Sequence, residues 1–357
     1  MQNRPMIDII LPNLNKARFI KDCISSLKEQ TFSDWRCVVI DGFSDDGSWE
    51  IIQESALQDK RFELHQLPKS GLYNSWNFGL SKVSSPYFCI LTSDDVWEKD
   101  WLETAIQSLD EHESAICAAA RTRILYEDSQ PGGILSNNLI GERFFMTDST
   151  SPQLRCGVTD SVAQYFLGSI YASVHSVVLR SSILETGGRF AEDLGNAADQ
   201  DWFMKIGLHG DVVYHPGIEA MWRVYKGQAT ELKEQEQKGK AIREIHSRNR
   251  QLIAAKLGGF GKEFIAIAEE YDKRLLEYHF DRPNFTNLFL QPLTEFPKLL
   301  RIFSESPKAL ITDFLCKLSG KSYFLEGSLA VARLAHESME RSSNYLQSQD
   351  PDICSAS

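Results

Sequence analysis

Two acidic side chains stand next to each other where an apolar run ends. The run "YFCIL" at 87–91 is followed by Thr92, Ser93, Asp94 and Asp95. Adjacent carboxylates repel each other unless a cation offsets them, and Mg²⁺ or Mn²⁺ prefers oxygen ligands and bridges to phosphates. An isolated Asp-Asp pair is typical of a solvated loop. At the end of a strand we instead predict a divalent metal site, in which Asp95 holds the ion, Asp94 supports it or faces a ribose, and the ion neutralises a diphosphate leaving group.

A second pair of carboxylates lies in "NAADQDWFMKIG" at 196–207. Asp199 and Asp201 flank Gln200 on the way into a segment that we expect to be a helix. Carboxylates in the first turn of a helix interact favourably with its dipole, which would account for both without any chemistry. The alternative is a general base, because activation of a hydroxyl nucleophile needs a carboxylate within hydrogen-bond reach of its proton.

Polar residues also follow two other apolar runs. In "VIDGFSDDGSWEII" at 39–52, Asp41 precedes a turn and a helix for which Ser48 is a candidate N-cap. Turn and capping chemistry explain this stretch, unless Asp41 accepts hydrogen bonds from the edge of a base such as uracil. In "PKSGLYNSWNFGLSKV" at 68–83, Lys69, Asn77 and a helix N-terminus can meet phosphate or ribose oxygens, although an ordinary amphipathic helix is the alternative.

The last polar candidates lie between 173 and 230. His175 in "SVHSVV" is interpreted as a histidine packed in a strand. Arg223 and Lys226 in "WRVYKGQAT" either meet a phosphate or are solvated charges.

These residues need elements that bring them together, and the first hundred residues supply a regular alternation. Apolar runs that read as strands lie at 7–11, 36–40, 62–67 and 87–91. Segments that read as helices lie at 17–30, 48–55, 73–82 and 99–110. Strict alternation predicts an α/β fold of Rossmann-like type, with a mostly parallel sheet and helices on both faces. Ligands of such sheets bind at the carboxyl ends of the strands, where the polar residues above lie.

The rhythm changes after about residue 120. We expect an irregular excursion or a helix-containing insert at 122–170, an alternating strand at 173–180, and a charged helical region from 231 with a frayed end. The predicted domains are therefore 1–230 as the catalytic domain and 231–357 as a helical C-terminal region.

Composition excludes several classes of protein. The 357 residues carry a net charge of −11, which argues against a nucleic-acid binder, since affinity for the phosphate backbone comes from clustered Lys and Arg. The seven cysteines are scattered without a C-x-x-C pair, so we expect neither a disulfide framework nor a zinc site, and a reducing cytosol fits. No apolar stretch is long enough for a signal peptide or a membrane span. We expect a cytoplasmic protein, with peripheral contact at the inner face of the membrane as an option.

Three segments in order, "IILPNLNKARFI" to "VVIDGFSDDGSWEII", "KSGLYNSWNFGLSKV" to "LTSDDVW", and "VHSVVLR" to "NAADQDWFMKIG", resemble the family 2 glycosyltransferases of the GT-A fold. The resemblance covers about 5–230 and implies an inverting transferase that uses a nucleotide-diphosphate sugar and a divalent metal. It also implies roles for single residues: the nucleotide at Pro12, Asn15, Asp41 and Asp45, the metal at Asp94 and Asp95, and the catalytic base at Asp199.

The sequence departs from the family pattern at three positions that matter. Thr92 stands where many members have the first Asp of the metal motif, and Tyr225 stands where many have a His. Ala198 replaces the Glu of the "ED" motif, so Asp199 and Asp201 both stay candidates for the base.

Two other functions compete with this interpretation. A sugar-1-phosphate nucleotidyltransferase would want a glycine-rich basic loop, which "LPNLNKAR" does not have. A degenerate nucleotide- or sugar-binding module gains from Thr92 and Ala198. For the transferase, the expected acceptor is a glycan or lipid-linked glycan of cell-surface polysaccharide or lipopolysaccharide synthesis. The stretch at 297–318 either meets a membrane or packs on the rest of the chain.

Overall fold

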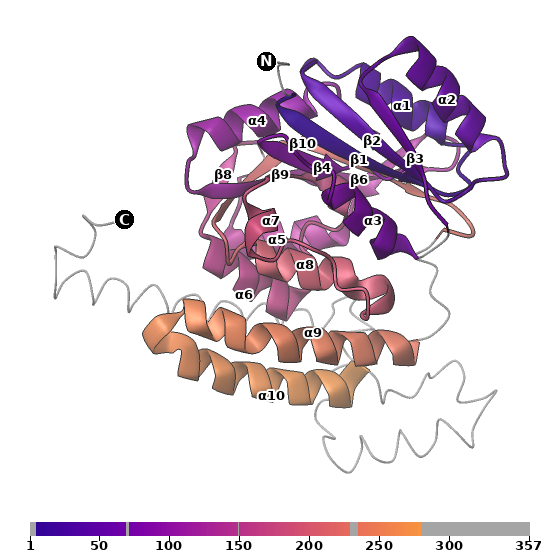
Figure 1. Cartoon of the computed structure of the whole chain (residues 1–357). Helices are drawn as coiled ribbons and strands as arrows, with labels where there is room; N and C mark the ends of the chain where they lie inside the picture. The colour runs from indigo at the N-terminus through magenta and orange to yellow at the C-terminus, as the bar shows by residue number, and fades with distance from the viewer. Residues whose placement is uncertain (1–4, 69–70, 149, 229–234, 280–357) are drawn as a thin grey trace, which may run out of the picture. The chain divides into compact units, whose positions relative to one another are not determined.

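The computed structural model describes residues 5–68, 71–148, 150–228 and 235–279 (Figure 1). It divides the chain into two compact units, of which the first comprises Met1–Gln164 with Gly168–Glu231 and the second Tyr165–Leu167 with Leu232–Ser357. Three predictions lie outside the described residues: the role of Lys69, the use of the stretch at 297–318, and the frayed end of the C-terminal region.

The first unit begins with a parallel sheet. Its strands are arranged in the order β3 (Phe62–Gln66), β2 (Trp35–Asp41), β1 (Ile7–Asn13) and β4 (Tyr87–Ile90), all parallel. The connecting helices are α1 (Ile20–Lys28), α2 (Ser48–Gln58) and α3 (Leu72–Leu80). Figure 1 shows α1 and α2 on one side of these strands and α3 on the other. The predicted α/β fold is confirmed, and the strands and helices lie within a few residues of their expected positions.

Strand β1 is buried on both faces, as expected for a central parallel strand. Ile9 belongs to the same buried cluster as Ile24 of α1, while Ile10 faces α3. A Cβ added at Gly79 of α3 would lie 2.4 Å from Ile10 Cγ2, so glycine is required for α3 to pack this closely. This contact fixes the position of α3 on the sheet and directs its N-terminus to the carboxyl end of β1.

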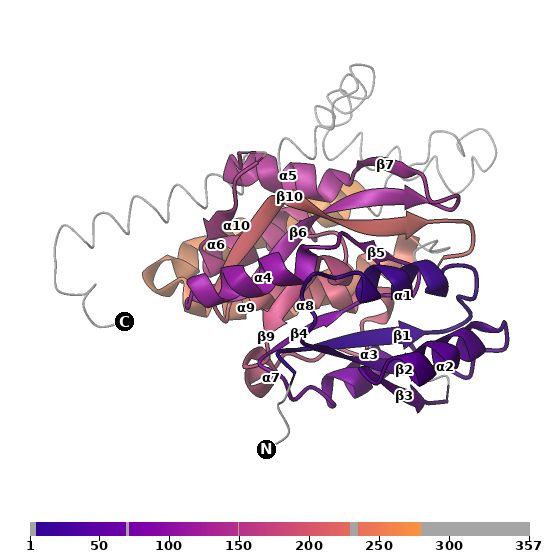
Figure 2. The same ribbon diagram turned by 90° about the horizontal axis from the view of Figure 1, so that it is seen from above.

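The sheet continues beyond β4 with mixed strands. β9 (Val177–Arg180) runs antiparallel between β4 and β6 (Ala115–Tyr126), and β10 (Asp211–Val224) and β5 (Val96–Trp97) follow at the far side. Figure 2 shows this half of the sheet from above. The strand expected at 173–180 is shorter, since Val174–Ser176 forms a 3₁₀ turn. Its cause is local: the Ser176 hydroxyl donates to the carbonyl oxygens of Tyr171 and Ser173.

The region at 122–170 is more regular than an irregular excursion. It holds the end of β6, β7 (Pro131–Ile134), α5 (Ser136–Phe145), β8 (Gln153–Arg155) and α6 (Gly157–Leu167). β7 pairs with β6 and β8 pairs with β10, so the helix-containing insert extends the sheet. The other helices of this unit are α4 (Trp101–Glu111), α7 (Ile183–Thr186) and α8 (Ala198–Ile206).

Helices α6 and α8 meet through glycine. A Cβ at Gly207, which follows α8, would lie 2.0 Å from the carbonyl oxygen of Gly157, the first residue of α6. A Cβ at Gly157 would lie 2.0 Å from the carbonyl oxygen of Gly210. No side chain fits at either contact, so backbone packs directly on backbone where α8 ends.

The second unit contains α9 (Gln235–Lys256) and α10 (Gly261–His279). Within it the Asp272 carboxylate accepts from Tyr165 Oη at 2.6 Å and from Arg250 Nη2 at 2.7 Å, and lies 2.6 Å from His246 Nδ1. The Tyr165 and His246 rings stack at 4.1 Å. Within the described residues, no helix has the length and apolarity needed to cross a membrane.

Candidate functional site

A cavity of about 460 Å³ lies at the carboxyl ends of β1 and β4, where the predicted site residues were expected. Its walls come from the ends of these strands, the N-terminus of α3, the segment before β9, the start of α8 and the segment at and after the end of β10. The polar and aromatic side chains among its described lining residues are Asn13, Lys16, Tyr73, Ser75, Trp76, Thr92, Ser93, Asp94, Asp95, Ser173, Asn196, Asp199, Trp222 and Gln228. The structure therefore brings Asp94, Asp95 and Asp199 together around one space.

Asp94 is paired with a lysine. Lys16 Nζ lies 2.8 Å from Asp94 Oδ2, and the Tyr225 hydroxyl donates to the same oxygen at 2.7 Å. Lys16 Nζ also contacts the Tyr225 hydroxyl, which closes a triangle of three polar groups. Burial, followed by the nearby Asp94 carboxylate, raises the pKa of Tyr225 well above its ordinary value. The tyrosine is therefore a neutral donor to Asp94 at physiological pH.

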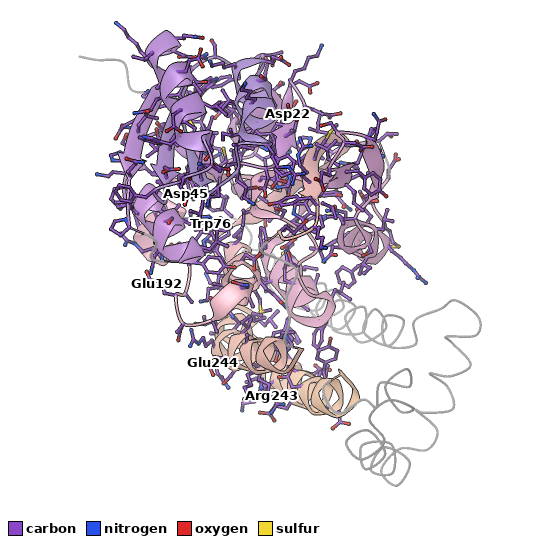
Figure 3. All side chains as sticks on the ribbon, turned by 90° about the vertical axis from the view of Figure 1, so that its right-hand side faces the viewer. Asp22, Asp45, Trp76, Glu192, Arg243 and Glu244 are labelled. Atoms are coloured by element: carbon purple, nitrogen blue, oxygen red, sulfur yellow. The ribbon has the colours of Figure 1, made fainter. Side chains whose placement is uncertain are left out.

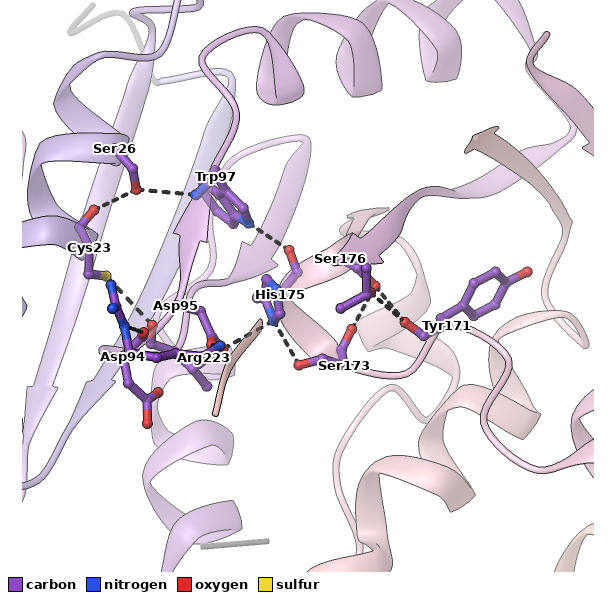
Figure 4. A network of polar contacts seen from close by, with 12 residues as sticks. Cys23, Ser26, Asp94, Asp95, Trp97, Tyr171, Ser173, His175, Ser176 and Arg223 are labelled. Atoms are coloured by element: carbon purple, nitrogen blue, oxygen red, sulfur yellow. Dashed lines mark hydrogen bonds and ion pairs between the residues drawn. The ribbon is translucent and has the colours of Figure 1, made fainter. Parts of the chain in front are cut away.

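Asp95 is enclosed by groups of the protein, and its side chain is 2% exposed. Its Oδ1 accepts from the Arg223 backbone N–H at 2.8 Å, and its Oδ2 accepts from the Thr92 hydroxyl. His175 Nδ1 lies 3.1 Å from Oδ2 and also contacts the Ser173 hydroxyl at 2.7 Å (Figure 4). The packed histidine predicted from sequence is thus fully buried, and it packs against an acid of the site.

Arg223 supports the same strand end from behind. Its side chain is 1% exposed, Nε donates to the Asp94 carbonyl oxygen at 2.9 Å, and Nη2 lies 2.9 Å from Asp22 Oδ2. Figure 3 labels Asp22. Arg223 is therefore neither solvated nor directed at a phosphate, the two roles considered from sequence. It adds a buried positive charge next to the two carboxylates.

The donor set around Asp94 and Asp95 does not fit the expected divalent ion. A hard cation needs several oxygen ligands, whereas both Asp95 oxygens already accept hydrogen bonds and an ammonium group occupies one Asp94 oxygen. Thr92 donates to Asp95 and Tyr225 donates to Asp94, so these positions offer neutral hydroxyl groups in place of the carboxylate and imidazole of the family pattern. Over the described ranges no group of three His, Cys, Asp or Glu side chains forms a potential metal site.

Asp199 stands on the cavity wall in the first turn of α8. Its backbone N–H contacts the Tyr73 hydroxyl at 3.4 Å, and its Oδ1 accepts from the Gln200 backbone N–H at 2.8 Å. Burial, and then the Asp199 carboxylate, raise the pKa of Tyr73 well above its ordinary value. Tyr73 stays protonated beside Asp199, and its ring stacks on Phe190 at 5.5 Å, which holds its position.

Asp201 differs from Asp199 in its surroundings. Its side chain is 1% exposed, it is absent from the described cavity lining, and Oδ2 accepts from Lys205 Nζ at 2.6 Å one turn further along α8. A carboxylate held in this way is positioned to stabilise the helix. Of the two candidates for a base, Asp199 is the one that borders the cavity.

Asp41, which we expected to accept hydrogen bonds from a nucleotide base, already accepts hydrogen bonds from neutral groups of the protein. Asp41 is fully buried and accepts from Asn13 Nδ2 at 2.8 Å, from the Ser44 hydroxyl at 2.6 Å and from Gln66 Nε2 at 3.2 Å. Ser48 is the first residue of α2 rather than its N-cap, because Gly47 with φ +92° precedes it. Asp41 holds the turn, and its contact with a nucleotide stays a prediction.

Three other predicted residues lie around the site without lining the described cavity, while Pro12 lines it. Asn15 and Asp45 are exposed and bond each other, with Asn15 Nδ2 at 2.8 Å from Asp45 Oδ1. Asn77 is buried and bridges α3 to Phe190, whose backbone N–H and carbonyl oxygen it meets at 2.9 Å each. Figure 3 labels Asp45, and also Trp76 of α3, which does line the cavity.

Several lining residues had no signal in the sequence that singled them out. Lys16 reads as an ordinary solvated lysine after a strand, and Asp94 lies 78 positions away from it. Tyr73 and Trp76 read as the apolar face of a helix. The aromatic rings on that helix face are the one sequence feature that could have indicated a binding site, since aromatic rings line many sugar and nucleotide sites.

Comparison with known proteins relates part of the chain to a protein family. Residues 8–165 match the model of glycosyl transferase family 2. The putative teichuronic acid biosynthesis glycosyltransferase TuaG of Bacillus subtilis is 30% identical over 113 residues, which cover 31% of this chain and 45% of that relative.

Two solved structures share the fold. The crystal structure of S. aureus TarS 1-349 in complex with UDP-GlcNAc matches 94% of this chain and 92% of its own, with a TM-score of 0.57 at 16% identity. The mannosyltransferase PcManGT of Pyrobaculum calidifontis, in complex with GDP-Man and Mn²⁺, matches 93% and 87%, with a TM-score of 0.52 at 15% identity. Residues 8–165 of this chain therefore match glycosyl transferase family 2, and the chain shares its fold with these two transferases.

Proposed function

We propose that this enzyme transfers a sugar, with inversion, from a nucleotide-diphosphate donor to a hydroxyl acceptor. The observation that carries the proposal is the shared cavity, which Asp94 borders from β4 and Asp199 borders from α8. A cavity of about 460 Å³ is in the range of small-molecule sites. The UDP-GlcNAc and GDP-Man in the two structural neighbours support a donor of this class.

The proposed reaction is a single displacement. Asp199 accepts the proton of the acceptor hydroxyl, and the oxygen forms a bond to the anomeric carbon while the bond from that carbon to the diphosphate oxygen breaks. The nucleoside diphosphate leaves from the opposite face with the bonding electron pair. Positioning by the cavity walls lowers the barrier, because both substrates are held in line.

The surroundings of Asp199 suit a base. Its Oδ1 is oriented by the backbone N–H of Gln200, and the neutral Tyr73 beside it adds no competing negative charge. Trp76 and Trp222 add aromatic faces to the same cavity, and such faces pack against the apolar faces of sugar rings.

The proposal also covers the acceptor and the pathway in which the enzyme acts. We propose a glycan or lipid-linked glycan acceptor in cell-surface polysaccharide synthesis, which the name of the Bacillus relative supports.

The test is release of nucleoside diphosphate from UDP-, GDP- and dTDP-sugars in the presence of candidate acceptors. Asp199→Asn should lower kcat about 10²–10⁴-fold on the accepted donor, because an amide cannot take the proton. Asp201→Asn is the matched control on the same helix and should change kcat less than about tenfold. Equal losses in the two variants would contradict the assignment of Asp199, and no release from any donor would contradict the proposed function.

A further inference from the structure

The positive charge at the end of β4 belongs to the chain itself. Lys16 is the one Lys or Arg among the described residues that line the cavity, and its ammonium group lies on Asp94. The side chains of Lys16 and Asp94 are 21% and 18% exposed, so the pair is reachable by a ligand yet partly shielded from water.

Lys16 has hydrogen-bonding capacity beyond its two contacts with Asp94 and Tyr225. An ammonium group has three N–H donors and no acceptor. One donor faces Asp94 Oδ2 and a second faces the Tyr225 hydroxyl, which in turn donates to Asp94. One N–H is left for a ligand oxygen, and its charge is held in place by two partners.

Thr92 and Tyr225 stand where, by the family resemblance, many members carry an Asp and a His. Each uses its hydroxyl as a donor to one of the two acids. The repulsion between Asp94 and Asp95 is offset by Lys16 on one side and by Arg223 and its backbone N–H on the other. No divalent ion is required to make this strand end stable.

We infer that Lys16, oriented by Asp94 and Tyr225, is the cation that meets the diphosphate of the donor, and that nucleoside diphosphate binding does not depend on a divalent metal. The inference rests on the proposed function, because it assumes a nucleotide-diphosphate donor in this cavity. It differs from the arrangement in PcManGT, whose structure holds Mn²⁺ with GDP-Man.

The experiment is titration calorimetry of the full chain with UDP, GDP and dTDP, in excess EDTA and again with Mn²⁺. The wild-type protein should bind one of the three with affinities in the two buffers that agree within about threefold. Lys16→Met should weaken binding in EDTA about tenfold or more, which is the usual size of a lost charge-assisted hydrogen bond. Mn²⁺ should restore part of that loss, since the variant leaves Asp94 without its cation.

The matched control is Lys21→Met, which removes an exposed lysine of α1 and should bind as the wild type does. Lys16→Arg keeps the charge and should retain binding in EDTA. The wild-type comparison of the two buffers needs no variant, so it decides the metal question even where Lys16→Met fails to fold.

Each other result has a separate meaning. Binding by the wild type in Mn²⁺ but not in EDTA would overturn the inference and leave the proposed transferase intact. Unchanged binding by folded Lys16→Met in EDTA would overturn the role of Lys16. Absence of binding to all three nucleotides in both buffers would instead contradict the proposed function.

Discussion

The carboxyl ends of β2 and β4 each carry an aspartate, and the two carboxylates have different surroundings. At the end of β2, Asp41 is fully buried and accepts hydrogen bonds from the neutral groups of Asn13, Ser44 and Gln66. At the end of β4, Asp94 borders the cavity and is paired with the charge of Lys16. Neutral donors fix a loop, whereas an ammonium group that borders a cavity can also meet a ligand. The difference lies in the partners, since both acids follow apolar strands.

The comparison predicts that removing Asp41 mainly lowers stability. Asp41→Ala leaves the donors of Asn13, Ser44 and Gln66 without their common acceptor, so the free energy of unfolding should fall by about 4 kcal/mol. Denaturant unfolding measures this. Asp45→Ala, in the exposed pair with Asn15 in the same turn, is the control and should cost less than about 1 kcal/mol. Equal losses would break the distinction between a buried anchor and an exposed pair.

Asp160 is a further buried acid, and its effect on stability should depend on pH. Burial raises the pKa of Asp160 from 3.8 to about 6, although the Tyr171 hydroxyl donates to it. The folded protein therefore favours the protonated acid, so its contribution to stability is full below about pH 4 and is lost as the pH rises through 6. By linkage the loss is about 3 kcal/mol. Asp160→Asn should flatten this part of a stability–pH curve, and an unchanged curve would show that another group titrates there.

At the end of β4, by contrast, removing Asp94 should mainly lower the affinity for a ligand. Asp94→Ala removes the carboxylate that orients Lys16 toward the cavity, so nucleoside diphosphate affinity should fall about tenfold while the free energy of unfolding changes by less than about 1 kcal/mol. Calorimetry and denaturant unfolding on the same sample measure both. A large stability loss with unchanged affinity would place Asp94 in the same class as Asp41.

The smallest effect is expected at Tyr225. Tyr225→Phe keeps the ring that packs on Phe19 at 4.6 Å and removes the hydroxyl that orients Lys16 and Asp94. Nucleoside diphosphate affinity should fall about threefold, the size of one neutral hydrogen bond. An effect as large as that of Asp94→Ala would mean that the tyrosine, rather than the carboxylate, holds the lysine.

Sequence reasoning found the parallel half of the sheet because each strand and helix there has its own local pattern of apolar residues. It placed Asp94 and Asp95 at the edge of the sheet where strand ends meet, whereas Asp199, at the start of a helix, was assigned to the same site only through the family resemblance. It predicted the strand at 173–180 but not its antiparallel place between β4 and β6, since sheet order depends on distant pairings that a four-residue strand does not reveal. Lys16 was missed for a related reason: a lysine's partner is chosen by the fold, and here it lies far along the chain.

The glycine contact between α6 and α8 has a consequence for motion. Two helices that meet through side chains can slide as rotamers change, whereas Gly157 and Gly207 leave no side chain to adjust. The end of α8 is therefore locked, and the first turn that carries Asp199 lies only two turns away on the same short helix. If Asp199 is the base, we expect adaptation to acceptors of different size to come from the other walls of the cavity, while the start of α8 keeps its position.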